Sequence, residues 1–134
     1  MRDYTHQQAV HYLLSKPQAL LDYPFGDDVK VFKVKNKMFA TLSLGTGNEK
    51  GTAGKMKGYY CMNLKCAPEE AVMLRDIFPA VIPGYHMHKA QWNTIILDGS
   101  IGQGEIERMI DNSFNLVVSK MTKKDQQSIL MHLE

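Results

Sequence analysis

The stretch that decides the fold is Val29-Lys-Val-Phe-Lys-Val-Lys-Asn-Lys-Met-Phe-Ala-Thr-Leu-Ser-Leu44. Its two halves, Val29 to Val34 and Lys37 to Leu44, are rich in β-branched and apolar residues, which favour strands. A polar break around Lys35-Asn36-Lys37 separates them. We therefore predict a β-hairpin, and we expect it to begin an antiparallel sheet.

Further strands are predicted downstream of the hairpin. The segment from Gly45 to Gly58 contains five glycines and almost nothing apolar, which is typical of a mobile surface loop. Tyr59 to Lys65 then alternates apolar and polar side chains, as a half-buried strand does. Val81 to Met87 has the composition of an irregular edge strand interrupted at Pro83, and Trp92 to Leu97 is a clearer strand.

Helices are predicted at the two ends of the chain and between strands. Thr5-x-x-Gln8 has the form of a capping box and predicts a helix to about Ser15. Pro68-Glu69-Glu70 is suited to a first helical turn, so a second helix should run to Phe78. Apolar residues at helical spacing predict a third helix from about Gln103 to Ser119, and Thr122 to Leu133 predicts a fourth.

The order of these elements fixes the fold class. Strands gather in the middle of the chain, helices lie at both ends, and there is no regular β-α-β alternation. We expect an α+β fold: one domain over residues 1–134, with an antiparallel sheet of about five strands flanked by N-terminal and C-terminal helices. A chain of this length can bury a core without disulfides or metal.

Composition excludes several classes of protein. The 134 residues include 16 basic and 14 acidic ones, a net charge of +2, which is too even to indicate a nucleic-acid binder by itself. No apolar run approaches the length of about 18 residues that crosses a bilayer, and the N-terminus lacks the apolar stretch of a signal peptide. We expect a cytoplasmic protein with no membrane partner, in which Cys61 and Cys66 are reduced structural thiols.

Recognisable catalytic and metal-binding motifs are absent from the sequence. His86-x-His88 on one strand face would supply two metal ligands, but no third ligand is positioned by the sequence. The glycine segment matches neither a phosphate-binding loop nor a dinucleotide fingerprint. We therefore expect no metal, no cofactor and no catalytic residue.

Lysines cluster between Lys30 and Gly58, where Glu49 is the only acidic residue. If the hairpin and the glycine loop project from one side of the sheet, their lysines could contact a row of phosphates. Neutralising four or five phosphates predicts a log–log salt slope of roughly −4. The candidate nucleic-acid-binding residues are Lys33, Lys35, Lys37, Lys50, Lys55 and Lys57.

A longer motif carries a resemblance. Pro83-Gly-Tyr-His-Met-His-Lys89, followed by Gln91-Trp-Asn-Thr-Ile-Ile-Leu-Asp-Gly-Ser100, closely resembles the MmcQ/YjbR family. Asp22 to Asp28, Lys33 to Phe39 and Glu105 to Val118 are also similar to that family, so the resemblance covers nearly the whole chain. His88 stands where the family usually has asparagine, and Gln91 stands where it often has histidine.

The resemblance implies an antiparallel sheet flanked by helices, similar to secretion chaperones, in a double-wing arrangement proposed to bind DNA. The family has no established enzymatic reaction. Within the matched motif, Tyr85, His86, Lys89 and Trp92 are candidate ligand-binding residues, and a lone tryptophan such as Trp92 usually serves packing.

Three hypotheses about function remain. The first is sequence-tolerant DNA binding through lysine-bearing wing loops. The second is a protein-binding or chaperone-like module, which would display an apolar surface. The third is an enzyme or small-ligand-binding protein that uses Tyr85, His86 and Lys89 in a pocket, although these residues form no recognisable triad. No sequence feature fixes an oligomeric state.

Overall fold

The predicted hairpin is present and forms two adjacent strands of the sheet. In the computed structural model, which describes residues 4–131, β2 (Val29–Val34) pairs antiparallel with β3 (Lys37–Leu44). The two turn residues, Lys35 and Asn36, have positive φ angles of 49° and 65°. A two-residue turn with positive φ at both positions matches the twist of the flanking strands, so the turn fixes the register of the hairpin.

The sheet has six strands in the order β1-β2-β3-β4-β6-β5, and every neighbouring pair is antiparallel. The other four strands are β1 (Ala19–Asp22), β4 (Tyr60–Lys65), β5 (Val81–Pro83) and β6 (Trp92–Ile96). The sequence predicted about five strands and missed β1. That strand has only four residues and is defined by its pairing with β2 rather than by a pattern of its own.

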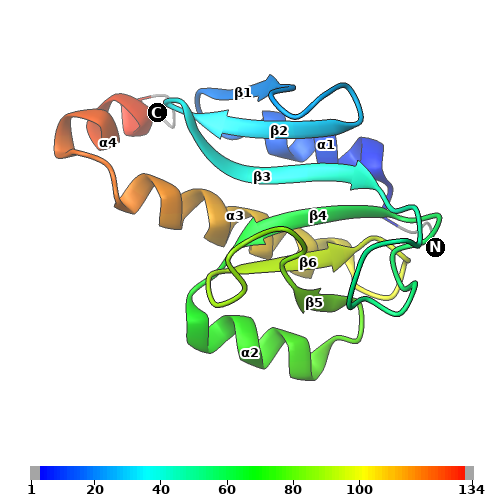
Figure 1. Cartoon of the computed structure of the whole chain (residues 1–134). Helices are drawn as coiled ribbons and strands as arrows, with labels where there is room; N and C mark the ends of the chain where they lie inside the picture. The colour runs from blue at the N-terminus through cyan, green and yellow to red at the C-terminus, as the bar shows by residue number, and fades with distance from the viewer. Residues whose placement is uncertain (1–3, 132–134) are drawn as a thin grey trace.

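Four helices complete the α+β fold that the sequence predicted. They are α1 (His6–Leu14), α2 (Pro68–Ile77), α3 (Gln103–Ser119) and α4 (Lys123–Leu130). Helices α1 and α3 cover one face of the sheet, α2 lies beside β5, and α4 follows α3 at the end of the sheet where β2 meets β3 (Figure 1). The Thr5–Gln8 capping box of α1 is confirmed.

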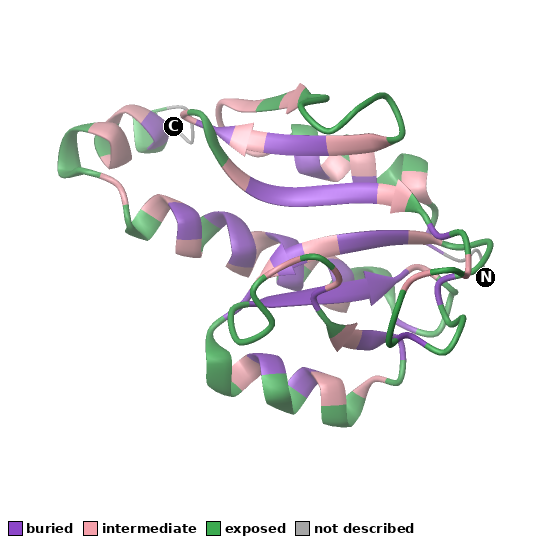
Figure 2. Ribbon diagram, in the orientation of Figure 1, coloured by how far each residue is buried: buried purple, intermediate pink, exposed green. Residues whose placement is uncertain are grey.

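The core lies between the sheet and α3. Buried positions concentrate on the central strands and on the inner side of α3 (Figure 2). The rings of Phe39 on β3 and Phe114 on α3 meet edge to face, with centroids 5.2 Å apart. All five apolar residues that predicted α3 are buried: Ile106, Met109, Ile110, Phe114 and Val117.

A buried serine joins α3 to a break in the sheet. Phe32 pairs with Ala40 and Lys33 with Met38, so Phe39 is the extra residue of a β-bulge. The Ser113 hydroxyl donates to the Phe39 carbonyl at 2.6 Å and accepts from the Lys65 amide at 2.8 Å. Ser113 thus pairs two backbone groups of different strands that would otherwise be buried without partners.

One predicted strand is shorter than expected. The interval from Val81 to Met87 forms β5 only as far as Pro83, and Gly84 to Gln91 turns back toward β6. A proline cannot donate to a ladder, and it ends the strand here. His86 and His88 therefore lie in a turn, and the shared strand face assumed for a metal site does not exist.

We expect Ser113→Ala to lower the free energy of unfolding by about 1–3 kcal/mol, because the Phe39 carbonyl and the Lys65 amide lose their common partner. Urea unfolding measures the difference. Ser119→Ala on the same helix is the matched control, since its exposed hydroxyl bonds only to the carbonyl of Leu116 within its own helix. Equal stability of both variants would contradict the bridging role of Ser113.

Candidate functional site

The six candidate lysines do not form one cluster. In an antiparallel sheet consecutive connections lie at opposite ends, so the β2–β3 turn and the β3–β4 loop are separated by the length of β3 (Figure 1). Eight residues of strand correspond to about 25 Å. Lys35 and Lys37 therefore lie far from Lys50 and Lys55, and the two groups cannot act as one short row of phosphate contacts.

Two of the hairpin lysines are already engaged. Lys33 forms a salt bridge with Asp22 at 2.9 Å, which lowers the pKa of that carboxyl. The ammonium of Lys35 donates to the Ser128 hydroxyl at 3.0 Å and lies 4.0 Å from the Asp125 carboxylate. Lys37 is exposed beside the turn.

The glycine loop is better anchored than its composition suggests. Met56, within the loop, is buried in the core, and Gly45 bonds through its amide to Tyr59 and through its carbonyl to Gly58. A Cβ atom at Gly45 would lie 1.9 Å from the Met56 carbonyl oxygen. The close approach of two backbone segments requires glycine at this position, and it fixes where the loop leaves the sheet.

The one carboxylate of the loop turns inward. Glu49 accepts hydrogen bonds from the amide and hydroxyl of Thr46, both at 2.9 Å, and from the Gly47 amide at 3.0 Å. The Thr46 amide contributes most to holding the pKa of Glu49 below its ordinary value of 4.5. Because its charge is directed at backbone amides, Glu49 forms no salt bridge with the loop lysines within residues 4–131.

The segment 84–91 is tied to the sheet by the buried side chain of Thr94 and the half-buried side chain of Asn63. On the sheet face opposite α3, the Thr94 hydroxyl accepts from the Tyr85 amide at 2.9 Å and is hydrogen-bonded to the Asn63 side chain. The Asn63 amide group in turn donates to the Tyr85 carbonyl at 3.4 Å. These bonds hold Tyr85 over β4 and β6.

Hydrogen bonds of Gly84 with Trp92 and Lys89 close the turn formed by residues 84–91. The Gly84 amide donates to the Trp92 carbonyl at 2.9 Å, and the Lys89 ammonium donates to the Gly84 carbonyl at 3.0 Å. Trp92 is buried, in agreement with a packing role. His86 has a left-handed backbone, with φ 59°, and its exposed ring lies against that of Tyr85 at 4.1 Å between centroids.

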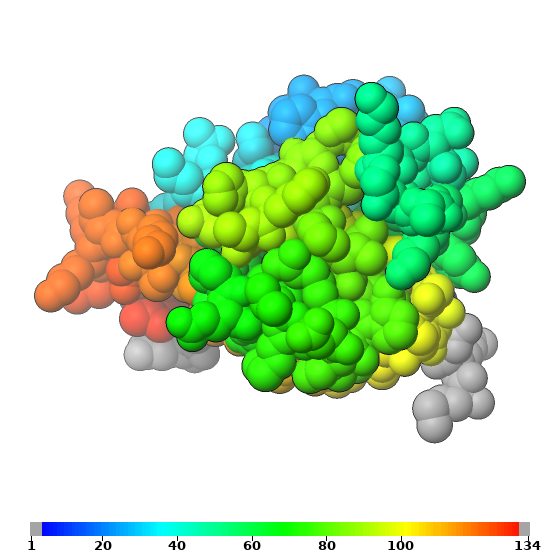
Figure 3. All heavy atoms as spheres, turned by 60° about the horizontal axis from the view of Figure 1, so that its bottom comes forward, coloured from blue at the N-terminus to red at the C-terminus, as the bar shows by residue number. Residues whose placement is uncertain are grey.

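The glycine loop and the 84–91 segment meet beside β5 and enclose a cleft of about 380 Å³, which we call the lysine cleft. The two segments lie next to each other on the surface above α2 (Figure 3). Lys50 and Lys55 line the cleft from one side, and Tyr85 and Lys89 from the other. No carboxylate contributes to its lining, and within residues 4–131 none of its three lysines forms a salt bridge.

The lysine cleft unites parts of two predicted sets. Lys50 and Lys55 were predicted to bind nucleic acid, and Tyr85 and Lys89 to bind a ligand. Sequence reasoning kept the sets apart because the two segments are about 30 residues distant along the chain. Lys57, His86 and Trp92 do not line the cleft.

The reactive side chains outside the lysine cleft include two cysteines and the potential metal ligands of residues 4–131. Both thiols are free and buried, and burial raises the pKa of Cys61 to about 12 and that of Cys66 to about 11, so neither is a nucleophile at neutral pH. Within residues 4–131 no three His, Cys, Asp or Glu side chains are grouped as metal ligands would be. None of the helices described has the length and apolar character needed to span a membrane.

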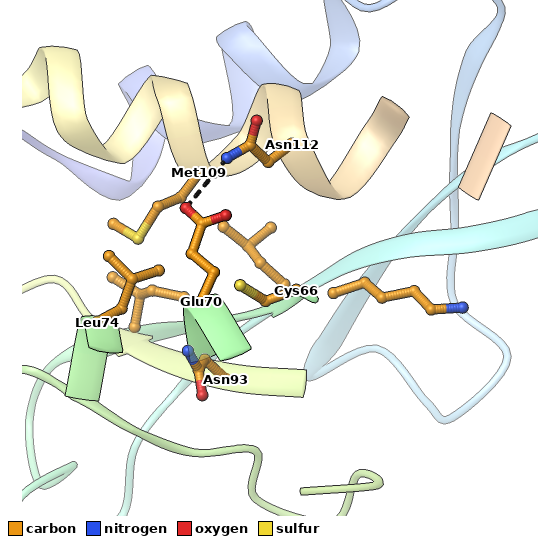
Figure 4. Close-up of a pocket in the computed structure, with 9 residues that line it drawn as sticks. Cys66, Glu70, Leu74, Asn93, Met109 and Asn112 are labelled. Carbon is orange, nitrogen blue, oxygen red and sulfur yellow. Dashed lines mark hydrogen bonds between the residues drawn. The ribbon is translucent and has the colours of Figure 1, made fainter. Parts of the chain in front are cut away.

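A cavity beneath α3 is too small for a ligand. Its volume is about 10 Å³, roughly the space of one water molecule. Glu70 enters it from α2 and accepts a hydrogen bond from Asn112 of α3, beside Cys66, Leu74 and Met109 (Figure 4). The cavity belongs to the packing of α2 against α3.

Comparison with known proteins assigns the chain to a family. The YjbR family model matches residues 14–116. The chain belongs to the YjbR family. It is 31% identical to the uncharacterized protein YbdF of Escherichia coli O157:H7 over 124 residues, which cover 92% of this chain and 93% of that protein. It is 27% identical to the uncharacterized protein YjbR of Escherichia coli K12, with 96% and 99% covered.

Solved structures agree with the fold. The YjbR-family chain is similar to a crystal structure from Deinococcus radiodurans, with a TM-score of 0.78 and 27% identity over 93% of this chain and 87% of that one. A crystal structure from Pseudomonas syringae gives a TM-score of 0.74 and 32% identity, over 84% of this chain and 98% of the other. None of these names assigns an activity.

We expect Thr94→Val to release the 84–91 segment, because the Tyr85 amide and the Asn63 side chain lose their shared partner. The free energy of unfolding should fall by about 1–3 kcal/mol, and amide exchange at Tyr85 should accelerate. Thr41→Val is the matched control: Thr41 pairs with Asn63 from β3 and is buried. Similar exchange at Tyr85 in both variants would contradict the anchoring role of Thr94.

Proposed function

We propose that this YjbR-family protein binds single-stranded nucleic acid through the lysine cleft. The observation that supports the proposal is that three lysines, Lys50, Lys55 and Lys89, line one concavity to which no carboxylate contributes. Such a site attracts phosphate groups and releases their counterions on binding.

The shape of the site favours a single strand over a duplex. A cleft of about 380 Å³ lies within the range of pockets that hold one small ligand, such as a single nucleotide unit. The adjacent rings of Tyr85 and His86 offer a surface on which an unstacked base can lie. The bases of a duplex are stacked inside the helix and cannot use that surface.

The proposal replaces the two-wing arrangement with a site on one side of the molecule. Lys35 and Lys37 are about one strand length from the cleft, so they are left out of the binding surface. Three phosphate contacts on a single strand correspond to a log–log salt slope of about −2, rather than the −4 expected for both loops together.

The test is fluorescence anisotropy with a labelled oligothymidylate at several salt concentrations. We expect the substitution pair K50Q/K55Q to weaken binding roughly tenfold or more at low salt and to reduce the slope to about −0.7, because one phosphate contact remains. The control pair K123Q/K124Q removes the same charge from exposed positions on α4. Equal affinity of the two pairs, or preference for a duplex, would count against the cleft.

A second candidate function, protein binding, is favoured by exposed apolar side chains on α2. Val72, Met73 and Ile77 are 55%, 54% and 58% exposed, and Met73 and Ile77 are one turn apart. A partner that covers them should slow amide exchange in the interface. We expect protection over α2 when cell extract is added, and none in M73K/I77K; unchanged exchange in the unsubstituted protein would remove this candidate.

A further inference from the structure

A second basic cavity lies at the opposite end of the sheet from the lysine cleft. It is formed where the β2–β3 turn, the end of β4 and the α3–α4 connection meet, at the side of the molecule where α4 lies (Figure 1), and its volume is about 420 Å³. Lys35, Lys37, Lys65 and Lys120 line it. They come from three separate regions of the sequence, so only the fold brings them together.

The charge of this cavity is strongly positive. Four lysines and one carboxylate, Asp125, give a net lining charge of +3. Asp125 lies 4.0 Å from Lys35, and this is the only salt bridge that the four lysines form within residues 4–131. Lys37, Lys65 and Lys120 are therefore available to an anionic ligand.

Part of the cavity lining is apolar. Met38 from β3, Val117 from α3 and Met121 after α3 contribute to the lining. Val117 is buried, and the two methionines are partly exposed. Methionine side chains adapt to ligands of irregular shape, and partly exposed apolar groups that share a lining with lysines suit a molecule with one apolar and one anionic end.

We propose that this cavity binds a small organic anion, with an apolar body against Met38 and Met121 and a phosphate group among Lys37, Lys65 and Lys120. The Asp125 carboxylate would repel additional phosphates, which favours a monophosphate over a polyphosphate chain. The site is independent of the nucleic-acid binding proposed above, because it shares no lining residue with the lysine cleft.

The test uses 1-naphthyl phosphate as the probe at constant ionic strength. The readout is the methyl NMR signals of Met38 and Met121, which M38L and M121L assign. We expect saturable shifts at both methyl groups. Inorganic phosphate and 1-naphthol should each bind at least roughly tenfold more weakly than 1-naphthyl phosphate, because each lacks one of the two interactions.

Charge removal locates the site. K37Q/K120Q changes two exposed lysines and should weaken the probe roughly tenfold or more. K50Q/K55Q removes equal charge from the lysine cleft and should leave probe binding unchanged while it weakens binding of the oligonucleotide, so the two proposals fail separately.

The absence of shifts at Met38 and Met121, equal loss of probe affinity in both variant pairs, or binding of 1-naphthol as tight as that of its phosphate would overturn the inference. Thermal unfolding checks that each variant is folded, and K120Q alone replaces the K37Q/K120Q pair if that pair unfolds.

Discussion

The antiparallel alternation of the sheet is the constraint on which the surface of this protein depends. Neighbouring strands of the sheet run in opposite directions, so the hairpin turn at Lys35 and the glycine loop after Leu44 must lie at opposite ends of β3. With α1 and α3 on one face, the connections that fold over the other face are exposed there. The same alternation that builds the core thus divides the lysines into two groups.

Buried polar bonds give this surface a defined shape. Loops without such bonds would be free to move apart, but Asn63 and Thr94 hold Tyr85 against the sheet, and the contacts of Gly45 with Met56 and Gly58 hold the two ends of the glycine loop together. On the sheet face that the helices cover, the Ser113 hydroxyl donates a hydrogen bond to the Phe39 carbonyl at the β-bulge. A polar group buried without a partner is costly, so these contacts specify one loop arrangement among those that the chain could adopt.

Much of the fold could be predicted because its signals are local. The capping box at Thr5, the strand propensity around Lys35 and the helical spacing before Val117 each depend on neighbours within a few residues. Strand β1 and the burial of Met56 could not be predicted, since both depend on partners distant in sequence. The candidate site was predicted only in part for the same reason: its residues were identified individually, but no sequence pattern indicates that Lys50 and Lys89 share a cleft.

The clustering of lysines in the sequence suggested that more of them share one binding surface than the fold allows. Lys33 is paired with Asp22, and Lys35 lies close to Asp125, a residue some 90 positions further along the chain. Lys37, Lys50 and Lys55 form no salt bridge within residues 4–131, and the fold adds Lys89 to the cavity at one end of the sheet and Lys65 and Lys120 to the cavity at the other. Two concavities with similar net charge but different linings result: one has a tyrosine beside it and the other has methionines. If both sites bind phosphate groups as proposed, their linings would distinguish ligands by the group attached to the phosphate, because the attraction of ammonium groups for phosphate would be common to both.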